Sequence, residues 1–250
     1  MRAISVLISV IGLFLSLAAA VAQPRRIIVL RHGEKTSSTG PLCATGVLRA
    51  SALAEVYLGK SAQNSLFGGG QPAAFFAVTG HTEATSKPSA NSWCLPVLRP
   101  KKNKPPAGEE VEDGDDDAAA EKEEILNRET QEAARDVLTN PSFAGKIVVM
   151  TWEHKHIANE KLEKRYPNER VTLRQLLNID DYAKAHPEEK IPRTWSGDNY
   201  DFFWIVDYAD SKSLKPSKIT IVKETFPTPY ESVPSNDWEK PEPTLQGCRQ

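Results

Sequence analysis

The stretch Arg25-Arg26-Ile27-Ile28-Val29-Leu30, followed directly by Arg31-His32-Gly33-Glu34-Lys35, decides the fold. Its first half is a short β-branched run without polar alternation, which is typical of a strand buried on both faces of a parallel sheet. Its second half is polar and begins abruptly. From Leu42 to Tyr57 apolar residues then recur at helical spacing. The stretch therefore predicts a strand, a loop and a helix, the first unit of an α/β fold.

Four further apolar runs have the length and composition of buried strands, and they cover residues 73–78, 146–152, 201–207 and 218–222. The run at 73–78 leads into a segment rich in Gly, Thr and Ser, which predicts a loop. The run at 146–152 leads into a charged helix that extends toward Tyr166. Strands that alternate with helices predict a three-layer α/β/α sandwich, a mainly parallel sheet with helices on both faces.

The N-terminus has the pattern of a secretory signal peptide. Arg2 is followed by an apolar run over residues 4–20 and by Ala20-Val21-Ala22, a small-x-small cleavage site. We predict cleavage after Ala22, which leaves residues 23–250 as a single secreted or periplasmic domain that is not bound to a membrane. An uncleaved anchor is the alternative, because the run approaches the roughly 20 residues that a spanning helix needs.

The composition fits one globular domain: the 250 residues are 40% hydrophobic and 26% charged, with a formal net charge of -2. A charge so close to neutral argues against nucleic acid as a partner. Cys43, Cys94 and Cys248 are too few for a disulfide scaffold. In an oxidising compartment we expect one bridge and one free thiol, with the pairing left open. The oligomeric state is open as well.

An unusual charged segment lies between the second and third predicted strands. Residues 99–104 are basic and include Pro100, and residues 109–124 carry ten carboxylates against one lysine, Lys122. Such a segment has too few apolar side chains to order itself by burial. We therefore predict a flexible, solvated acidic insertion at about residues 101–124.

Polar clusters follow two of the predicted strands, Arg31-His32 after the first and Glu153-His154 after the third. Ligands of open α/β sheets bind beyond the carboxyl ends of the strands, where both clusters are expected. A neutral imidazole at His32 is a good nucleophile near neutral pH. The Arg31 guanidinium can fork two hydrogen bonds onto phosphate oxygens, and His154 can donate to a transferring phosphoryl group. Together they predict a phosphate pocket.

These motifs resemble those of the histidine phosphatase superfamily, also called phosphoglycerate mutase-like. The Arg-His-Gly motif of the family stands here as Arg31-His32-Gly33, and its strand-then-histidine motif stands at residues 149–154. The pattern Leu42-x-x-x-Gly46-x-x-Arg49-Ala50 is similar to the first helix of the family, and residues 195–206 are covered as well. The resemblance implies a phosphoglycerate mutase-like fold in which His32 is the residue that is transiently phosphorylated. It also implies that Arg31 is a phosphate clamp and His154 a second pocket histidine.

Family members usually supply a second arginine after the second strand, where this chain has Ser86-Lys87-Pro88-Ser89. We predict Lys87 as its replacement, which would bind phosphate together with Arg31 and with Gly33, whose backbone can pass close to a ligand. Lysine offers a point charge without the planar fork of arginine. His81 and Arg99 are the alternatives for this role.

The proton donor for the leaving group is also open. Glu34 and Glu153 are the carboxylates nearest to the two histidine motifs, and partial burial would raise the pKa of either one. We favour Glu153. His156 lies two positions beyond His154 and is expected to point away from the pocket.

The predicted function is that of an exported phosphomonoesterase, a hydrolase of the histidine acid phosphatase type acting on a small phosphorylated substrate. Export favours hydrolysis over a mutase reaction. We expect no metal and no cofactor, because His32, His154 and His156 lack a further cluster with zinc-ligand spacing. The alternative is a non-catalytic phosphate- or phospholigand-binding protein with the same pocket, since a lysine replaces the arginine and no acid is assured.

Overall fold

The computed structural model describes residues 23–100, 115–209, 213–240 and 243–249. The predicted signal peptide and the first part of the predicted acidic insertion, residues 101–114, lie outside these described residues. No helix in the described ranges is both long and apolar enough to cross a membrane.

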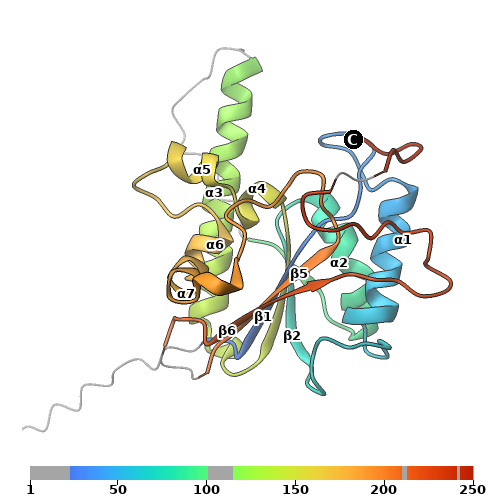
Figure 1. Ribbon diagram of the computed structural model, residues 1–250, viewed down its shortest axis with the longest axis horizontal. Coiled ribbons are helices and arrows are strands. Elements are labelled where there is room, and N and C mark those ends of the chain that lie inside the picture. The colour runs from blue at the N-terminus through green and yellow to red at the C-terminus, as the bar shows by residue number, and fades with distance from the viewer. Residues whose placement is uncertain (1–22, 101–114, 210–212, 241–242, 250) are drawn as a thin grey trace, which may run out of the picture.

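A six-stranded sheet forms the centre of the molecule, with the strand order β3-β2-β4-β1-β5-β6 (Figure 1). The strands are β1 (Arg26–Arg31), β2 (Pro72–Ala77), β3 (Val97–Leu98), β4 (Ile147–Trp152), β5 (Phe202–Asp207) and β6 (Lys218–Lys223). The pairs β3/β2, β2/β4 and β4/β1 are parallel, while β5 runs antiparallel to both of its neighbours. The sheet is thus mainly parallel, as predicted, and the sequence analysis missed only the two-residue β3.

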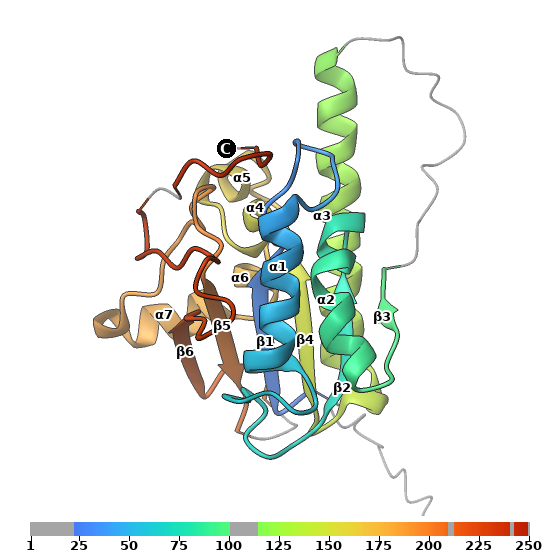
Figure 2. The same cartoon turned by 90° about the vertical axis from the view of Figure 1, so that its right-hand side faces the viewer.

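Helices cover both faces of this sheet (Figures 1 and 2). One face carries α1 (Ala44–Leu53), the π-helical turn η1 (Ala54–Leu58) and α2 (Gly80–Ser92). The other carries α3 (Asp115–Thr139), α4 (His154–Ile157), α5 (Glu160–Arg165), α6 (Leu173–Leu176) and α7 (Ile179–Ala185), with the 3-10 turns η2 (Pro141–Phe143) and η3 (Pro187–Glu189). Successive side chains of β1 alternate between the layers: Ile28 packs with α1, whereas Ile27 and Val29 pack with α3 and α6. The predicted three-layer sandwich is confirmed.

The register of the central strands brings the two polar clusters together. Arg31 of β1 is paired with Trp152 of β4, and the His32 amide donates to the Trp152 carbonyl at 3.3 Å. Because the two strands are parallel and adjacent, the residues that follow them leave the sheet at the same edge. His32 and Glu153 are therefore neighbours in space.

The loop predicted after the second strand is instead helix α2. Its buried residues recur four apart along the helix: His81, Thr82, Thr85, Ser86, Ser89 and Ala90. Most of them are small and polar, so the face that packs on the sheet carries no apolar periodicity. The helix begins with a capping box in which the Thr79 side chain accepts from the Thr82 amide, a local signal that outweighs Gly80 and Pro88.

The second half of the predicted acidic loop is also helical, because α3 begins at Asp115. Alanines occupy residues 118–120, and glutamate and lysine follow, all of them good helix formers. Further along, Ala133, Ala134 and Val137 of α3 are buried in the core against the sheet. This packing anchors the helix, and the charged turns extend from it (Figure 2).

Candidate active site

His32 lies directly beyond β1 and its side chain is buried. Its Nδ1 atom is 2.7 Å from the Gly33 carbonyl oxygen, which only accepts, so Nδ1 carries the proton and Nε2 has the lone pair. Within the described residues, Nε2 has no hydrogen-bond partner. Burial, together with the nearby Arg31 charge, lowers the pKa of His32 to about 4. The imidazole is therefore neutral near pH 7 and has a free lone pair.

Arg31 is buried beside His32 and held by the loop that precedes β5. Its Nη1 atom donates to the carbonyl oxygens of Gly197 at 2.6 Å and Asn199 at 2.8 Å. The guanidinium carbon lies 3.7 Å from the centre of the Tyr200 ring, a cation–π contact. In the part of the chain that the structure describes, Nε of Arg31 has no hydrogen-bond partner. The Arg31 guanidinium is therefore held in a fixed position, and its Nε–H group remains able to donate a hydrogen bond to a ligand.

Glu153 and His81 complete the surroundings of His32. His81 at the start of α2 shares a short hydrogen bond with Oε1 of Glu153, and Thr79 donates to the same oxygen at 3.0 Å. The other carboxylate oxygen, Oε2, lies 3.3 Å from Nε2 of His32. Burial alone would raise the pKa of Glu153, but the hydrogen bond with His81 counters this effect, and that pKa lies well below its usual range. An ionised carboxylate therefore covers the imidazole.

A pocket of about 460 Å³ opens above this cluster. The charged and imidazole side chains that line it are Arg31, Lys35, Lys122, Lys155, Arg249, Glu123, Glu153, His154 and His156. Cations outnumber carboxylates among them, so the pocket favours an anionic ligand. A second pocket of about 540 Å³ shares Lys122 and Glu153 with the first and includes His81 in its wall.

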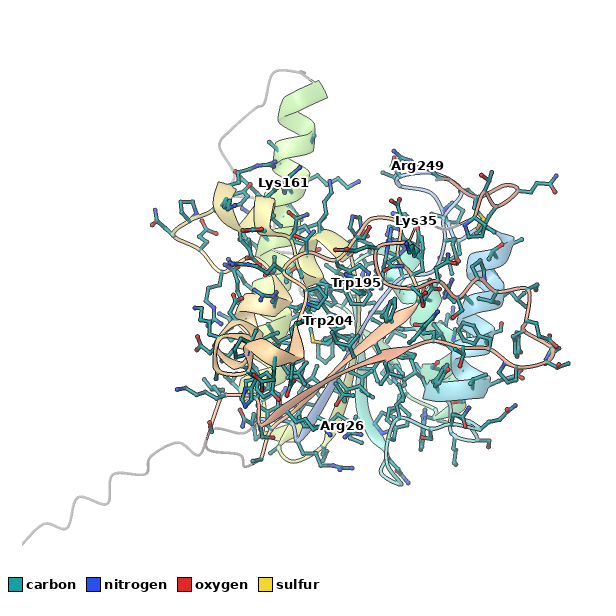
Figure 3. All side chains as sticks on the ribbon, in the orientation of Figure 1. Arg26, Lys35, Lys161, Trp195, Trp204 and Arg249 are labelled. Carbon is teal, nitrogen blue, oxygen red and sulfur yellow. A yellow bond between two sulfur atoms is a disulfide. The ribbon has the colours of Figure 1, made fainter. Side chains whose placement is uncertain are left out.

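A disulfide holds the C-terminal segment at the rim of the pocket. Cys43, just before α1, is bonded to Cys248, and the next residue, Arg249, donates its amide to the Lys35 carbonyl at 2.7 Å. Figure 3 shows Lys35 and Arg249 at the same end of the molecule, far from Arg26 at the start of β1. Cys94 is an exposed free thiol. The structure thus has the one bridge and one thiol that the sequence led us to expect.

His154 lies in the pocket wall, as predicted, and His156 lines the same pocket, contrary to expectation. Burial lowers the pKa of His154 to about 2, with Arg31 adding to the effect, and lowers that of His156 to about 4. His156 is buried, and its Nε2 is 3.0 Å from Oδ1 of Asn127 on α3. For Nδ1 of His154 the described chain offers no hydrogen-bond partner, which leaves its ring orientation less constrained.

Lys87 does not lie at the pocket. His81 and Thr85 are four residues apart on α2 and both face the His32 loop, so Lys87, two positions later, points to the opposite side and is exposed. Arg99 lines the second pocket, where its Nη2 donates to the Val78 carbonyl at 2.9 Å. Of the three residues considered for the second cation, the structure brings only His81 to His32.

Gly33 and Glu34 have structural contacts in place of the predicted ones. The Gly33 amide donates to Thr85 Oγ1 at 2.9 Å, and a Cβ on Gly33 would stand 2.9 Å from the Gly46 carbonyl oxygen. The missing side chain therefore allows the close approach of α1 and not of a ligand. Glu34 accepts from Nη2 of Arg49 at 2.7 Å and from its Nε at 3.1 Å, on the far side of the loop from His32. It is not placed to act as the acid.

Sequence comparison finds no match for this chain, and comparison with solved structures finds weak similarities. No protein-family model and no curated protein matches the chain. A mycobacterial glucosyl-3-phosphoglycerate phosphatase matches with 14% identity and a TM-score of 0.40, over 80% of this chain and 99% of its own. A protein described as mycobacterial hydrolase 2 matches with 13% identity and a TM-score of 0.43, over 84% of this chain and 94% of its own. The case for a function therefore depends on the residues of the site.

Proposed function

We propose that this chain is an exported phosphomonoesterase of the histidine phosphatase superfamily that works through a phosphohistidine on His32. The observation that carries the proposal is the state of that imidazole. It is buried and neutral, its Nδ1 proton is fixed by the Gly33 carbonyl, and its Nε2 lone pair has no hydrogen-bond partner in the described structure. Arg31 and the other cations of the pocket supply the positive charge that an attack on a phosphate dianion requires.

In the proposed reaction Nε2 of His32 attacks phosphorus while the bond from phosphorus to the ester oxygen breaks. That oxygen takes up a proton and leaves as an alcohol. Water then attacks the phosphohistidine and gives one proton back to the group that protonated the leaving oxygen, while the phosphorus–nitrogen bond breaks. This step regenerates the free His32 imidazole and releases inorganic phosphate. Arg31, and His154 as a neutral N–H donor, would stabilise the charge on the phosphoryl oxygens.

We propose the hydrogen-bonded pair of His81 and Glu153 as the proton donor. Glu153 by itself is a poor acid because its pKa is lowered, but its carboxylate holds the His81 ring nitrogen at this end of the pocket. The proton is held in the hydrogen bond between the His81 ring nitrogen and Oε1 of Glu153. An arriving phosphoryl group would repel the carboxylate from His32 and direct the pair toward the leaving oxygen.

The second candidate, a phosphate-binding protein without turnover, is favoured by one specific observation. The His32 side chain is only 1% exposed, and the Glu153 carboxylate 3.3 Å from Nε2 stands where a phosphoryl group would have to enter. Calorimetry with a phosphate ester separates the two functions. A stable heat of binding without release of inorganic phosphate over hours would favour the binding protein.

Export is the part of the proposal that depends on the N-terminal sequence. The apolar run at 4–20 with Ala20-Val21-Ala22 supports it, and so does the Cys43–Cys248 disulfide, because such bonds persist in oxidising compartments. N-terminal sequencing of protein isolated from outside the cytoplasm should begin at Gln23. A start at Met1 in a membrane fraction would favour the anchor.

Release of inorganic phosphate from a panel of phosphomonoesters, with chelator present, tests the enzymatic proposal. We expect turnover that His32→Ala abolishes and that His186→Ala leaves unchanged, since His186 stacks on Tyr182 away from the pocket. Acid-labile label from a ³²P-ester should remain on the wild-type chain after rapid quenching. Full activity in His32→Ala would exclude the phosphohistidine mechanism.

A further inference from the structure

Three potential metal ligands converge around Glu153, the residue that lines both pockets. One ligand atom each from His32, His81 and Glu153 can be chosen so that all lie within 4.8 Å of one another. They come from three different elements: the segment after β1, the start of α2 and the segment after β4. Two imidazole nitrogens and a carboxylate oxygen are a ligand set that suits Zn²⁺ and neighbouring transition metals.

The surrounding contacts orient these groups as metal ligands are oriented in known sites. The Gly33 carbonyl fixes the Nδ1 proton of His32, which leaves Nε2 as the only ring nitrogen able to coordinate. Thr79 donates to the Glu153 carboxylate and holds it between the two imidazoles. The His32 and His81 rings lie edge to face with centroids 4.6 Å apart, so their nitrogens can approach one ion from different directions.

The charges nearby set a limit on affinity. Lys35 Nζ is 3.4 Å from Nε2 of His81 and 4.0 Å from the Glu153 carboxylate, and Arg31 is fixed close to His32. These cations oppose a divalent ion, while the ionised Glu153 favours it. Access does not depend on the first pocket alone, because His81 and Glu153 also line the second one.

We propose that His32 Nε2, His81 Nε2 and the Glu153 carboxylate bind a divalent transition-metal ion such as Zn²⁺, and that the bound ion blocks phosphoryl transfer. The ion takes the lone pair of Nε2 that would attack phosphorus, and it replaces the proton shared by His81 and Glu153. Metal binding itself stands independently of the proposed function. Only the inhibitory consequence rests on it.

Titration of the untagged, metal-free protein with Zn²⁺ alone, followed by calorimetry, tests the site. We expect one ion per chain, with the absorption of a Co²⁺ substitute reporting nitrogen and oxygen ligands. Glu153→Gln and His81→Ala should each weaken binding by more than the roughly 10–100-fold that loss of an outer-shell contact causes. His154→Ala is the matched control, a histidine of the same pocket outside the ligand set, and should bind as the wild type does.

Lys35→Met should change affinity in the opposite direction, because it removes the ammonium group closest to His81. A gain in affinity cannot come from misfolding, so this variant keeps the test decisive if the ligand variants fold poorly. Absence of one-to-one binding, or binding unaffected by both Glu153→Gln and His81→Ala, would overturn the proposal.

The inhibition is measured separately. If the chain hydrolyses phosphomonoesters, Zn²⁺ should inhibit it competitively and chelator should restore the rate. Zinc binding without any hydrolysis would contradict only the proposed function. Hydrolysis that is insensitive to saturating Zn²⁺ would contradict the proposed inhibition and leave the proposed function intact.

Discussion

Two buried polar clusters lie on opposite sides of the loop formed by residues 31–34, and they are built in opposite ways. On one side Arg49 is surrounded by the carboxylates of Glu34, Asp201 and Glu224, with nitrogen–oxygen distances of 2.7 to 2.9 Å. On the other side His32 has an unpartnered lone pair within the described residues. The first cluster ties α1 to the sheet, and the second faces a ligand pocket.

The two clusters show how a polar group that is buried to stabilise the fold differs from one that is buried to bind a ligand. Burial of a charge costs free energy, which ion-pair and hydrogen-bond partners offset. The Arg49 guanidinium has such partners in Glu224, Glu34 and the Pro234 carbonyl. Burial of His32 is offset by only one hydrogen bond, to Gly33. Next to a pocket, a polar atom that folding leaves without a partner can bind a ligand.

Removal of Arg49 should have the largest effect on stability. Arg49→Met leaves three carboxylates in the core, and loss of one member of a buried ion cluster costs about 3–5 kcal/mol. Urea denaturation measures it. Arg26→Met is the control: its partner Asp207 is equally close, but both side chains are partly exposed, so we expect about 1 kcal/mol or less. Equal losses of unfolding free energy in Arg49→Met and Arg26→Met would show that the buried cluster stabilises the fold no more than the partly exposed ion pair does.

A matched pair of glutamate variants compares the two sides of the loop directly. Glu153→Gln should lower kcat on alkyl phosphates by roughly 10²–10⁴-fold, and we expect it to cost less stability than Glu34→Gln, because its side chain is more exposed and the amide oxygen can still accept from Thr79. Substrates with good leaving groups should be affected less. Glu34→Gln should do the reverse, with a loss of at least about 2 kcal/mol of stability from the Arg49 contact. A large stability loss in Glu153→Gln would make that residue structural.

His32 and Glu224, one from each cluster, should also differ in the sign of their pH dependence. The folded-state pKa of His32 is about 4, below its ordinary value of 6.5, so its contribution to stability is present above 6.5 and is lost as pH falls toward 4. Burial raises the pKa of Glu224 from 4.5 to about 8. Its contribution is therefore present below 4.5 and is lost as pH rises through 8.

Denaturation at a series of pH values checks both slopes. His32→Gln should flatten the acid side, and Glu224→Gln the alkaline side. The acid limb of kcat/KM should likewise fall near pH 4, because protonation removes the nucleophile. An acid limb at pH 6 to 7 would mean that His32 titrates normally.

Of all these variants, we expect the smallest effect from a change at Arg249, at the rim of the pocket. Arg249→Gln should raise KM roughly three- to tenfold with kcat unchanged, because an exposed cation contributes little more than one weak ion pair. Reduction of the Cys43–Cys248 bond should raise KM in the wild type and have no such effect in Arg249→Gln. Lys161→Gln on α5, outside the pocket, is the charge-matched control (Figure 3). An unchanged KM in Arg249→Gln would remove this residue from the binding site.

The sequence predicted the strands well because a buried strand is a local pattern: Ile27 to Leu30 and Ile147 to Met150 are continuous apolar runs whatever surrounds them. It failed at α2, whose buried face is small and polar, and at the start of α3, whose charged turns have no local apolar pattern. The cap at Thr79 also lacks the usual sequence signature, because Thr82 and not Glu or Gln stands three residues later, so α2 had no strong local signal.

For the site, the sequence by itself determined that Arg31 and His32 follow a buried strand and that Glu153 and His154 follow another, since these facts depend only on neighbours along the chain. Only the tertiary structure decided which side chains meet. The packing of α2 on the sheet brought His81 and not Lys87 to His32, and the approach of α1 turned Glu34 to Arg49. Disulfide pairing and the position of Arg249 were decided in the same way. The direction of a side chain, and its distance from residues far along the chain, arise from packing, which no local pattern records.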